Sequence, residues 1–127
     1  MKAKLKEIYS LELTHPLEAF RPNNEMNFGI SVRLMIGLEN SPGSESFDVL
    51  VCTPDWITGQ YSEDKCVWGR HMLIVFEYNF DLIKRKIEHY IADCTGPDWL
   101  TIARKLSQIG AWEFEDYRPP TASSMHD

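Results

Sequence analysis

The stretch "NFGISVRLMIGL", residues 27–38, carries the clearest structural signal in the sequence. An apolar side chain occupies every even position from Phe28 to Leu38, and Ser31, Arg33 and Gly37 lie between them. A period of two turns one set of side chains toward a core and the other toward water, which is typical of an antiparallel sheet. The pattern therefore predicts a strand with one buried face.

The residues that follow predict a hairpin and a short helix. "ENSPGSES" (39–46) contains a Pro-Gly turn, and "FDVLVCT" (47–53) has the alternation of a second strand that pairs with the first. "TPDWITGQY" (53–61) predicts a short helix, with Thr53 as N-cap and Pro54 in the first turn. Further along, "GRHMLIVFEY" (69–78) is apolar at consecutive positions and predicts a central strand covered on both faces.

At the N-terminus, "AKLKEIYSLEL" (3–13) begins with alternation that slips in phase at Ile8 and Tyr9. This predicts a strand with a bulge or an early end. "THPLEAFRPNNE" (14–25) contains two prolines and two asparagines and predicts a loop.

The second half of the chain predicts two helices and a last strand. Asn79 or Asp81 can start the first helix, and apolar residues recur through 80–94 at helical spacing. The second helix has one apolar stripe and is expected to end with Gly110 as its C-cap; the stripe consists of Trp99, Ile102, Ala103, Leu106 and Ile109. "WEFEDY" (112–117) predicts a strand with Trp112 and Phe114 facing inward.

Together these elements predict one α+β domain over residues 1–118. We expect a mainly antiparallel sheet of about five strands, with two longer helices packed on it and one short helix. Residues 119–127 are polar and follow a proline pair, so a flexible C-terminal tail is expected there.

Composition narrows the classes of function. Thirteen basic and nineteen acidic side chains give a net charge of −6, which argues against nucleic-acid binding and favours a cationic partner. Three cysteines at wide spacings predict a reduced, cytoplasmic protein. The first ten residues have no apolar signal region, and no apolar run approaches the ~20 residues that cross a bilayer.

Few residues form a recognisable catalytic or metal-binding pattern. Cys52 at the start of the short helix could be a nucleophile with His71 as its base, although a strand cysteine between apolar residues is more typical of a core. The sequence has no CxxC, HExxH or glycine-rich phosphate motif, so we predict no metal and no cofactor.

The acidic residues of the last strand allow several interpretations. Glu113 and Glu115 would share one face with Tyr117, opposite Trp112, Phe114 and Asp116. Such a face can be simply solvated, or it can recognise a partner rich in Arg and Lys, whereas a catalytic pair is less expected. Trp68 lies at a strand entry without an apolar stripe, so it is either a flap over the core or a contact residue.

Three segments in this order resemble the immunity protein 8 family of bacterial polymorphic-toxin systems: "SFDVLVCTPDWI" (46–57), "WGRHMLIVFEYNF" (68–80) and "GAWEFEDY" (110–117). The resemblance implies a small cytoplasmic α+β protein without enzymatic activity. It also implies that such a protein binds and neutralises a toxin domain, but it transfers neither the toxin's identity nor the contact surface.

The leading hypothesis is therefore a non-catalytic immunity protein whose partner is a cognate toxin domain, with neither nucleic acid nor membrane as partner. The proposed partner-binding residues are Asp48, Trp68, Arg70, Glu77, Glu113, Glu115, Asp116 and Tyr117. Two alternatives remain: a thiol-dependent hydrolase using Cys52 and His71, and a homodimeric adaptor that pairs through the edge of its first or last strand.

Overall fold

The hairpin that the sequence predicts forms the centre of the sheet. The computed structural model describes residues 1–115, and in it β2 (Gly29–Leu38) pairs antiparallel with β3 (Glu45–Cys52), from Gly29 opposite Cys52 to Ile36 opposite Glu45. The even-numbered residues from Phe28 to Ile36 are all buried, which confirms the predicted inward face.

Three further strands complete the sheet. β1 (Ala3–Tyr9) pairs antiparallel with β2, and a register shift between Leu5 and Glu7 confirms the predicted bulge. β4 (Met72–Ile74) lies parallel to β3, while β5 (Ala111–Trp112) pairs antiparallel with the other end of β3. The order β1-β2-β3-β4, with β5 also beside β3, gives a mainly antiparallel sheet of five strands. The predicted α+β class is confirmed.

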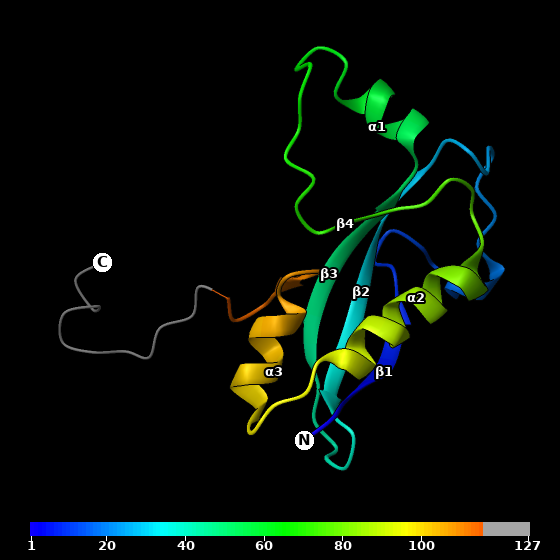
Figure 1. The fold of residues 1–127 in the computed structure, drawn as a ribbon. Coiled ribbons are helices and arrows are strands. Elements are labelled where there is room, and N and C mark those ends of the chain that lie inside the picture. The colour runs from blue at the N-terminus through cyan, green and yellow to red at the C-terminus, as the bar shows by residue number, and fades with distance from the viewer. Residues whose placement is uncertain (116–127) are drawn as a thin grey trace, which may run out of the picture.

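Two helices cover one face of this sheet (Figure 1). α2 (Phe80–Asp93) starts at Asn79, whose side chain accepts a hydrogen bond from the backbone N–H of Leu82. α3 (Trp99–Leu106) starts at Asp98, which caps it in the same way. Their inward stripes are Ile83, Ile87 and Ile91 on α2, and Ile102, Ala103 and Leu106 on α3.

The remaining helices lie at the end of the sheet where β2 begins. α1 (Pro54–Gln60) has Thr53 as its N-cap, as the sequence predicts. A short 3-10 helix, η1 (Leu17–Ala19), occurs within the segment predicted as a loop. Tyr78 holds it in place, because its buried hydroxyl donates a hydrogen bond to the carbonyl of Leu17.

The prediction of a central strand at 69–78 is wrong. β4 spans three residues and ends the sheet, so only one of its edges is paired. His71 has a φ of 59°, which ends extended structure on one side. On the other side, the N–H of Tyr78 donates to the carbonyl of Glu25, which draws the chain away from β3.

Two predictions at the end of the domain are also wrong. β5 stops at Trp112, and a turn follows in which the N–H of Glu115 donates to the carbonyl of Trp112. The predicted alternation therefore does not continue through 113–115, and residues 116 and 117 lie outside the described part of the chain. α3 ends at Leu106, and Gly110 lies against β3, where an added Cβ would come within 2.9 Å of the Phe47 Cβ. Gly110 thus permits close packing and is not the C-cap.

Candidate protein-binding surface

α1 is attached rigidly to the sheet through the buried side chain of Thr53. The Thr53 hydroxyl oxygen accepts hydrogen bonds from the backbone N–H groups of Phe28 (3.1 Å) and Trp56 (3.4 Å). The Trp56 ring lies directly over Gly29, where a Cβ would come within 2.2 Å of it. Only glycine leaves room for the indole there, so the pair fixes where α1 sits.

Residues 61–71 form a segment that we call the arm, which stands away from the body between α1 and β4 (Figure 1). Its apolar residues are exposed: the Trp68 side chain is 93% exposed, and Val67 is also open to solvent. Tryptophan is enriched among the residues that contribute most to protein–protein binding. Trp68 is thus a contact residue or an unpacked aromatic, and it is not a flap over the core.

The base of the arm is fastened to the C-terminal part of the domain. The Arg70 guanidinium and the Glu115 carboxylate form an ion pair of 2.6 Å. The His71 imidazole is hydrogen-bonded through Nε2 to the carbonyl of Ser107, at 2.8 Å, and the His71 carbonyl accepts from the N–H of Leu50. These three contacts fix Arg70 and His71, which lie two and three residues after Trp68 in the chain.

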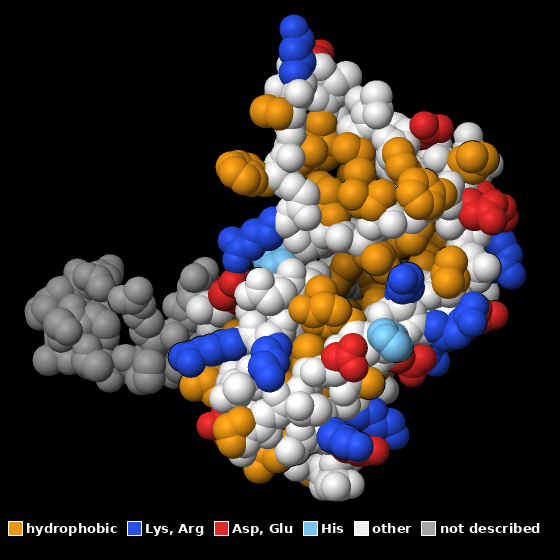
Figure 2. Space-filling view, viewed as in Figure 1, with side chains coloured by type: hydrophobic (Ala, Val, Ile, Leu, Met, Phe, Trp, Pro, Cys, Tyr) orange, Lys and Arg blue, Asp and Glu red, His pale blue; other side chains and the backbone are white. Residues whose placement is uncertain are grey.

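Beside the arm, the end strand and the residues after it expose further apolar side chains. Ile74 is 48% exposed and Phe76 is 76% exposed. Figure 2 shows hydrophobic side chains gathered between the arm, α1 and β4. We call Val67, Trp68, Ile74 and Phe76 the β4 surface. Exposed apolar side chains on an arm and on the end strand beside it are typical of a protein-binding site.

The remaining proposed contact residues are mostly engaged within the protein. Asp48 accepts two hydrogen bonds from Arg33, at 2.8 and 2.9 Å, and this raises the pKa of the Arg33 guanidinium. The Glu113 carboxylate accepts from the N–H of Ser46 at 2.6 Å. Glu113 and Glu115 therefore do not form one open acidic face.

Glu77, by contrast, is exposed next to Phe76 and lies beside the β4 surface. Asp116 and Tyr117 lie outside the described residues.

The structure does not bring Cys52 and His71 together as a catalytic pair. Cys52 is fully buried, and this burial raises the pKa of its thiol above the ordinary value, which opposes formation of a thiolate. The His71 ring instead bonds the carbonyl of Ser107. The geometry favours the interpretation of Cys52 as a core residue.

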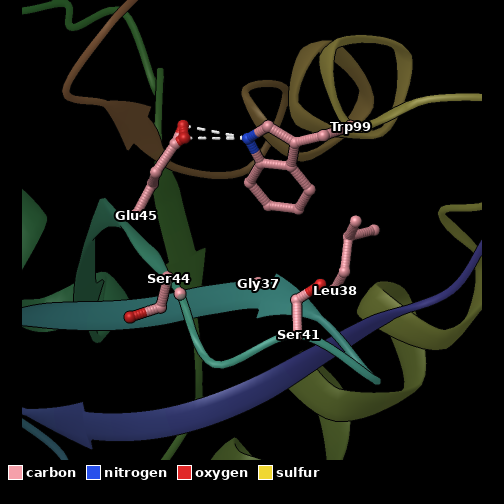
Figure 3. Close-up of a pocket in the computed structure, with 7 residues that line it drawn as sticks. Gly37, Leu38, Ser41, Ser44, Glu45 and Trp99 are labelled. Atoms are coloured by element: carbon pink, nitrogen blue, oxygen red, sulfur yellow. Dashed lines mark hydrogen bonds between the residues drawn. The ribbon is translucent and has the colours of Figure 1, made fainter.

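A separate cavity of about 290 Å³ lies at the opposite end of the hairpin, between β2, the turn after it and α3. Figure 3 shows that the Trp99 indole points to Glu45, and its N–H donates to both carboxylate oxygens at 2.9 and 2.8 Å. Leu38, Ser41 and Ser44 line the rest. Glu45 is the carboxylate in the lining of this cavity, and the Trp99 N–H already binds it. The cavity therefore offers no free carboxylate, and we interpret it as a result of packing.

Two further observations concern metals and membranes. Within residues 1–115, no group of three or more His, Cys, Asp or Glu side chains converges as a metal site would require. In the same part of the chain, no helix combines the length and hydrophobicity that a bilayer crossing demands.

Sequence reasoning found Trp68 but missed Ile74 and Phe76. The available signal was the uninterrupted apolar run at 72–76, which was interpreted as a strand covered on both faces. These residues are apolar as the sequence shows, but the fold leaves the side chains of Ile74 and Phe76 exposed.

The fold defines a small α+β domain with an open sheet, two helices on one face and an apolar surface at the end strand. The model of the immunity protein 8 family matches residues 3–117, and the chain therefore belongs to this family. Comparisons with curated proteins and with solved structures return no match.

Proposed function

We propose that this protein is a non-catalytic immunity protein that binds and neutralises a cognate toxin domain of a bacterial polymorphic-toxin system in the cytoplasm. The observation that carries the proposal is Trp68, an aromatic side chain 93% exposed on an arm whose base is fixed by Arg70 and His71. Family membership supplies the class of partner. Neutralisation follows when the bound protein covers the toxin's active site or a surface beside it.

Trp68 and Glu77 are the proposed direct contacts among the residues selected from the sequence. Trp68 supplies a large apolar side chain, and such residues dominate the energetics of protein interfaces. Arg70 and Glu115 support it from below through their ion pair. Asp48 and Glu113 are held by Arg33 and Ser46, and they reach a partner only if it extends over the adjacent sheet.

Charge supports a cationic partner. The chain carries a net charge of −6, and residues 54–77 contain four acids against two bases. One of those bases, Arg70, is paired with Glu115. An acidic surface accelerates encounter with a basic domain, and salt screens this attraction, because the Debye length falls from about 10 Å at 0.1 M to about 3 Å at 1 M.

Co-expression provides the test. Where an adjacent gene encodes a toxin-like C-terminal domain, that domain is expressed with or without this protein in a sensitive host, and its inactivated form is used for calorimetry and stopped-flow association. We expect restored growth, a 1:1 complex and association that slows as salt rises. A toxin domain from an unrelated system is the control. Failure of both rescue and binding would overturn the proposal, whereas binding with a salt-independent rate would overturn only the electrostatic part.

A further inference from the structure

The unpaired edge of β4 presents backbone groups to solvent. On the paired edge, the His71 carbonyl accepts from Leu50, and the Val75 N–H donates to the Cys52 carbonyl. Because successive residues of a strand direct their backbone groups to opposite edges, the N–H and C=O of Met72 and Ile74 point away from β3. Within residues 1–115, no backbone or side-chain group hydrogen-bonds these four.

Apart from the shortness of β4, this edge lacks the features that normally prevent strand addition. The opposite edge of the sheet, β1, carries Lys4 and Lys6 and is interrupted by a bulge, and both features discourage edge pairing. β4 and the two residues after it, "MLIVF" (72–76), contain neither a charge nor a proline. Natural sheets rarely leave such an edge open unless a partner pairs with it.

Both flanks of the β4 edge are mainly apolar, as an added strand requires. On the side of α2, a cavity of about 170 Å³ is lined by Leu73, Ile87 and Tyr90, and Lys86 is the charged residue in its lining. On the other side, Ile74 and Phe76 are exposed. Along the course of β4, Figure 2 shows hydrophobic side chains on either side of the strand. Alternate side chains of an added strand would enter these two flanks, and this arrangement gives strand addition its specificity.

We propose that β4 is a docking edge for an extended segment of the toxin domain, which adds to the sheet as a strand next to β4. This inference rests on the proposed function and specifies how the partner binds. Trp68 on the arm then covers the added strand from one end. β4 then becomes an interior strand of the sheet, with both of its edges paired.

Charge indicates what the docked segment contains. Glu77 is exposed just after the apolar run, whereas exposed Lys86 lines the cavity on the α2 side. Residues 54–77 as a whole contain four acids against two bases, and one of those bases, Arg70, is paired with Glu115. A segment with apolar residues at alternate positions, and with Lys or Arg on the side of Glu77 and not of Lys86, complements this surface.

A second copy of this chain fits less well. In the usual antiparallel pairing about a two-fold axis, the same face of each copy lies on the same side of the combined sheet. The acidic segments of the two copies would then lie next to each other, and each copy carries a net charge of −6.

The test compares Ile74→Pro with Ile74→Ala against the inactivated toxin domain of the adjacent gene. Proline removes the outward N–H of Ile74 and breaks no hydrogen bond within the sheet, so the fold should persist, which circular dichroism and thermal unfolding verify. Alanine removes the exposed side chain but keeps the N–H. We expect proline to weaken binding by about 100-fold and alanine by about 10-fold or less.

Amide hydrogen exchange by NMR gives a second readout on the unmodified chain. The N–H groups of Met72 and Ile74 should exchange rapidly in the free protein and become protected in the complex. Protection confined to the arm, or equal binding by the proline and alanine variants, would overturn strand addition while leaving the proposed function intact. If the wild-type chain neither binds nor rescues, the proposed function fails and this inference with it. A dimer in light scattering that Ile74→Pro abolishes would assign the edge to a second copy and overturn the choice of occupant.

Discussion

Replacement of Trp68 by alanine should separate binding from folding. The side chain is 93% exposed, so only about 7% of it contacts the rest of the chain. A tryptophan buries roughly 200 Å² when it is fully enclosed, and 7% of this area at about 25 cal/mol per Å² is ~0.4 kcal/mol. The free energy of unfolding should therefore fall by less than about 0.5 kcal/mol.

The same substitution should greatly weaken binding to the toxin domain. Full burial of Trp68 in the complex would contribute up to ~5 kcal/mol from ~200 Å² of apolar area. Part of this is offset by ordering of the arm, so a loss of about 2–4 kcal/mol is expected, as for other central interface tryptophans. This corresponds to a rise in Kd of roughly 30- to 1000-fold.

Isothermal calorimetry measures the Kd, and urea unfolding measures the stability, of Trp68→Ala and of a control variant. Leu11→Ala is the matched control, because Leu11 is 70% exposed but lies beyond the end of β1, away from the arm. Leu11→Ala should change neither the Kd for the toxin domain nor the free energy of unfolding appreciably. A loss of stability above ~1 kcal/mol in Trp68→Ala would show that Trp68 packs against the core. A Kd within threefold of wild type would show that Trp68 lies outside the interface.

Three further predictions concern the scaffold and the cysteines. Gly29→Ala should destabilise the protein by about 2–3 kcal/mol, measured by urea unfolding, because the new methyl group would overlap the Trp56 ring. The Asp98 carboxylate is hydrogen-bonded to the first turn of α3, which lowers its pKa below the ordinary 3.8. Since the folded pKa is the lower one, this stabilisation is present above about pH 4 and is lost as the pH falls through the folded pKa, so Asp98→Ala should destabilise more at pH 7 than in acid below about pH 4. An equal effect at both pH values would contradict the cap. Alkylation of the native protein at neutral pH should label exposed Cys66 rapidly and buried Cys52 only on unfolding, and rapid labelling of Cys52 would restore the thiol-hydrolase alternative.

Local patterns predicted the centre of the fold correctly. The alternation from Phe28 to Leu38 identified the inward face of β2, because a one-residue change of register would move every apolar side chain to the wrong face. Thr53 was recognised as a helix start and Asn79 as one of two candidate starts, because capping is a contact between residues two or three apart. Such features depend only on neighbours in the chain.

The acidic candidates were harder to predict because their partners are distant in sequence. Arg70 and Glu115 are 45 residues apart, and Glu113 and Ser46 are 67 apart. Whether a carboxylate faces solvent or bonds another segment depends on which segments the sheet brings together. No local pattern around Glu113 or Glu115 contains that information.

The sequence by itself determined the α+β class, the central hairpin, the main helices and the apolar character of residues 72–76, because these follow from periodicity and capping. The tertiary structure alone decided that this apolar run lies at the end of the sheet, with one edge unpaired within residues 1–115 and with Ile74 and Phe76 exposed. The physical reason is that a strand's side-chain pattern records which faces are to be covered, whereas the strand's position in the sheet depends on the backbone pairing of segments far apart in the chain.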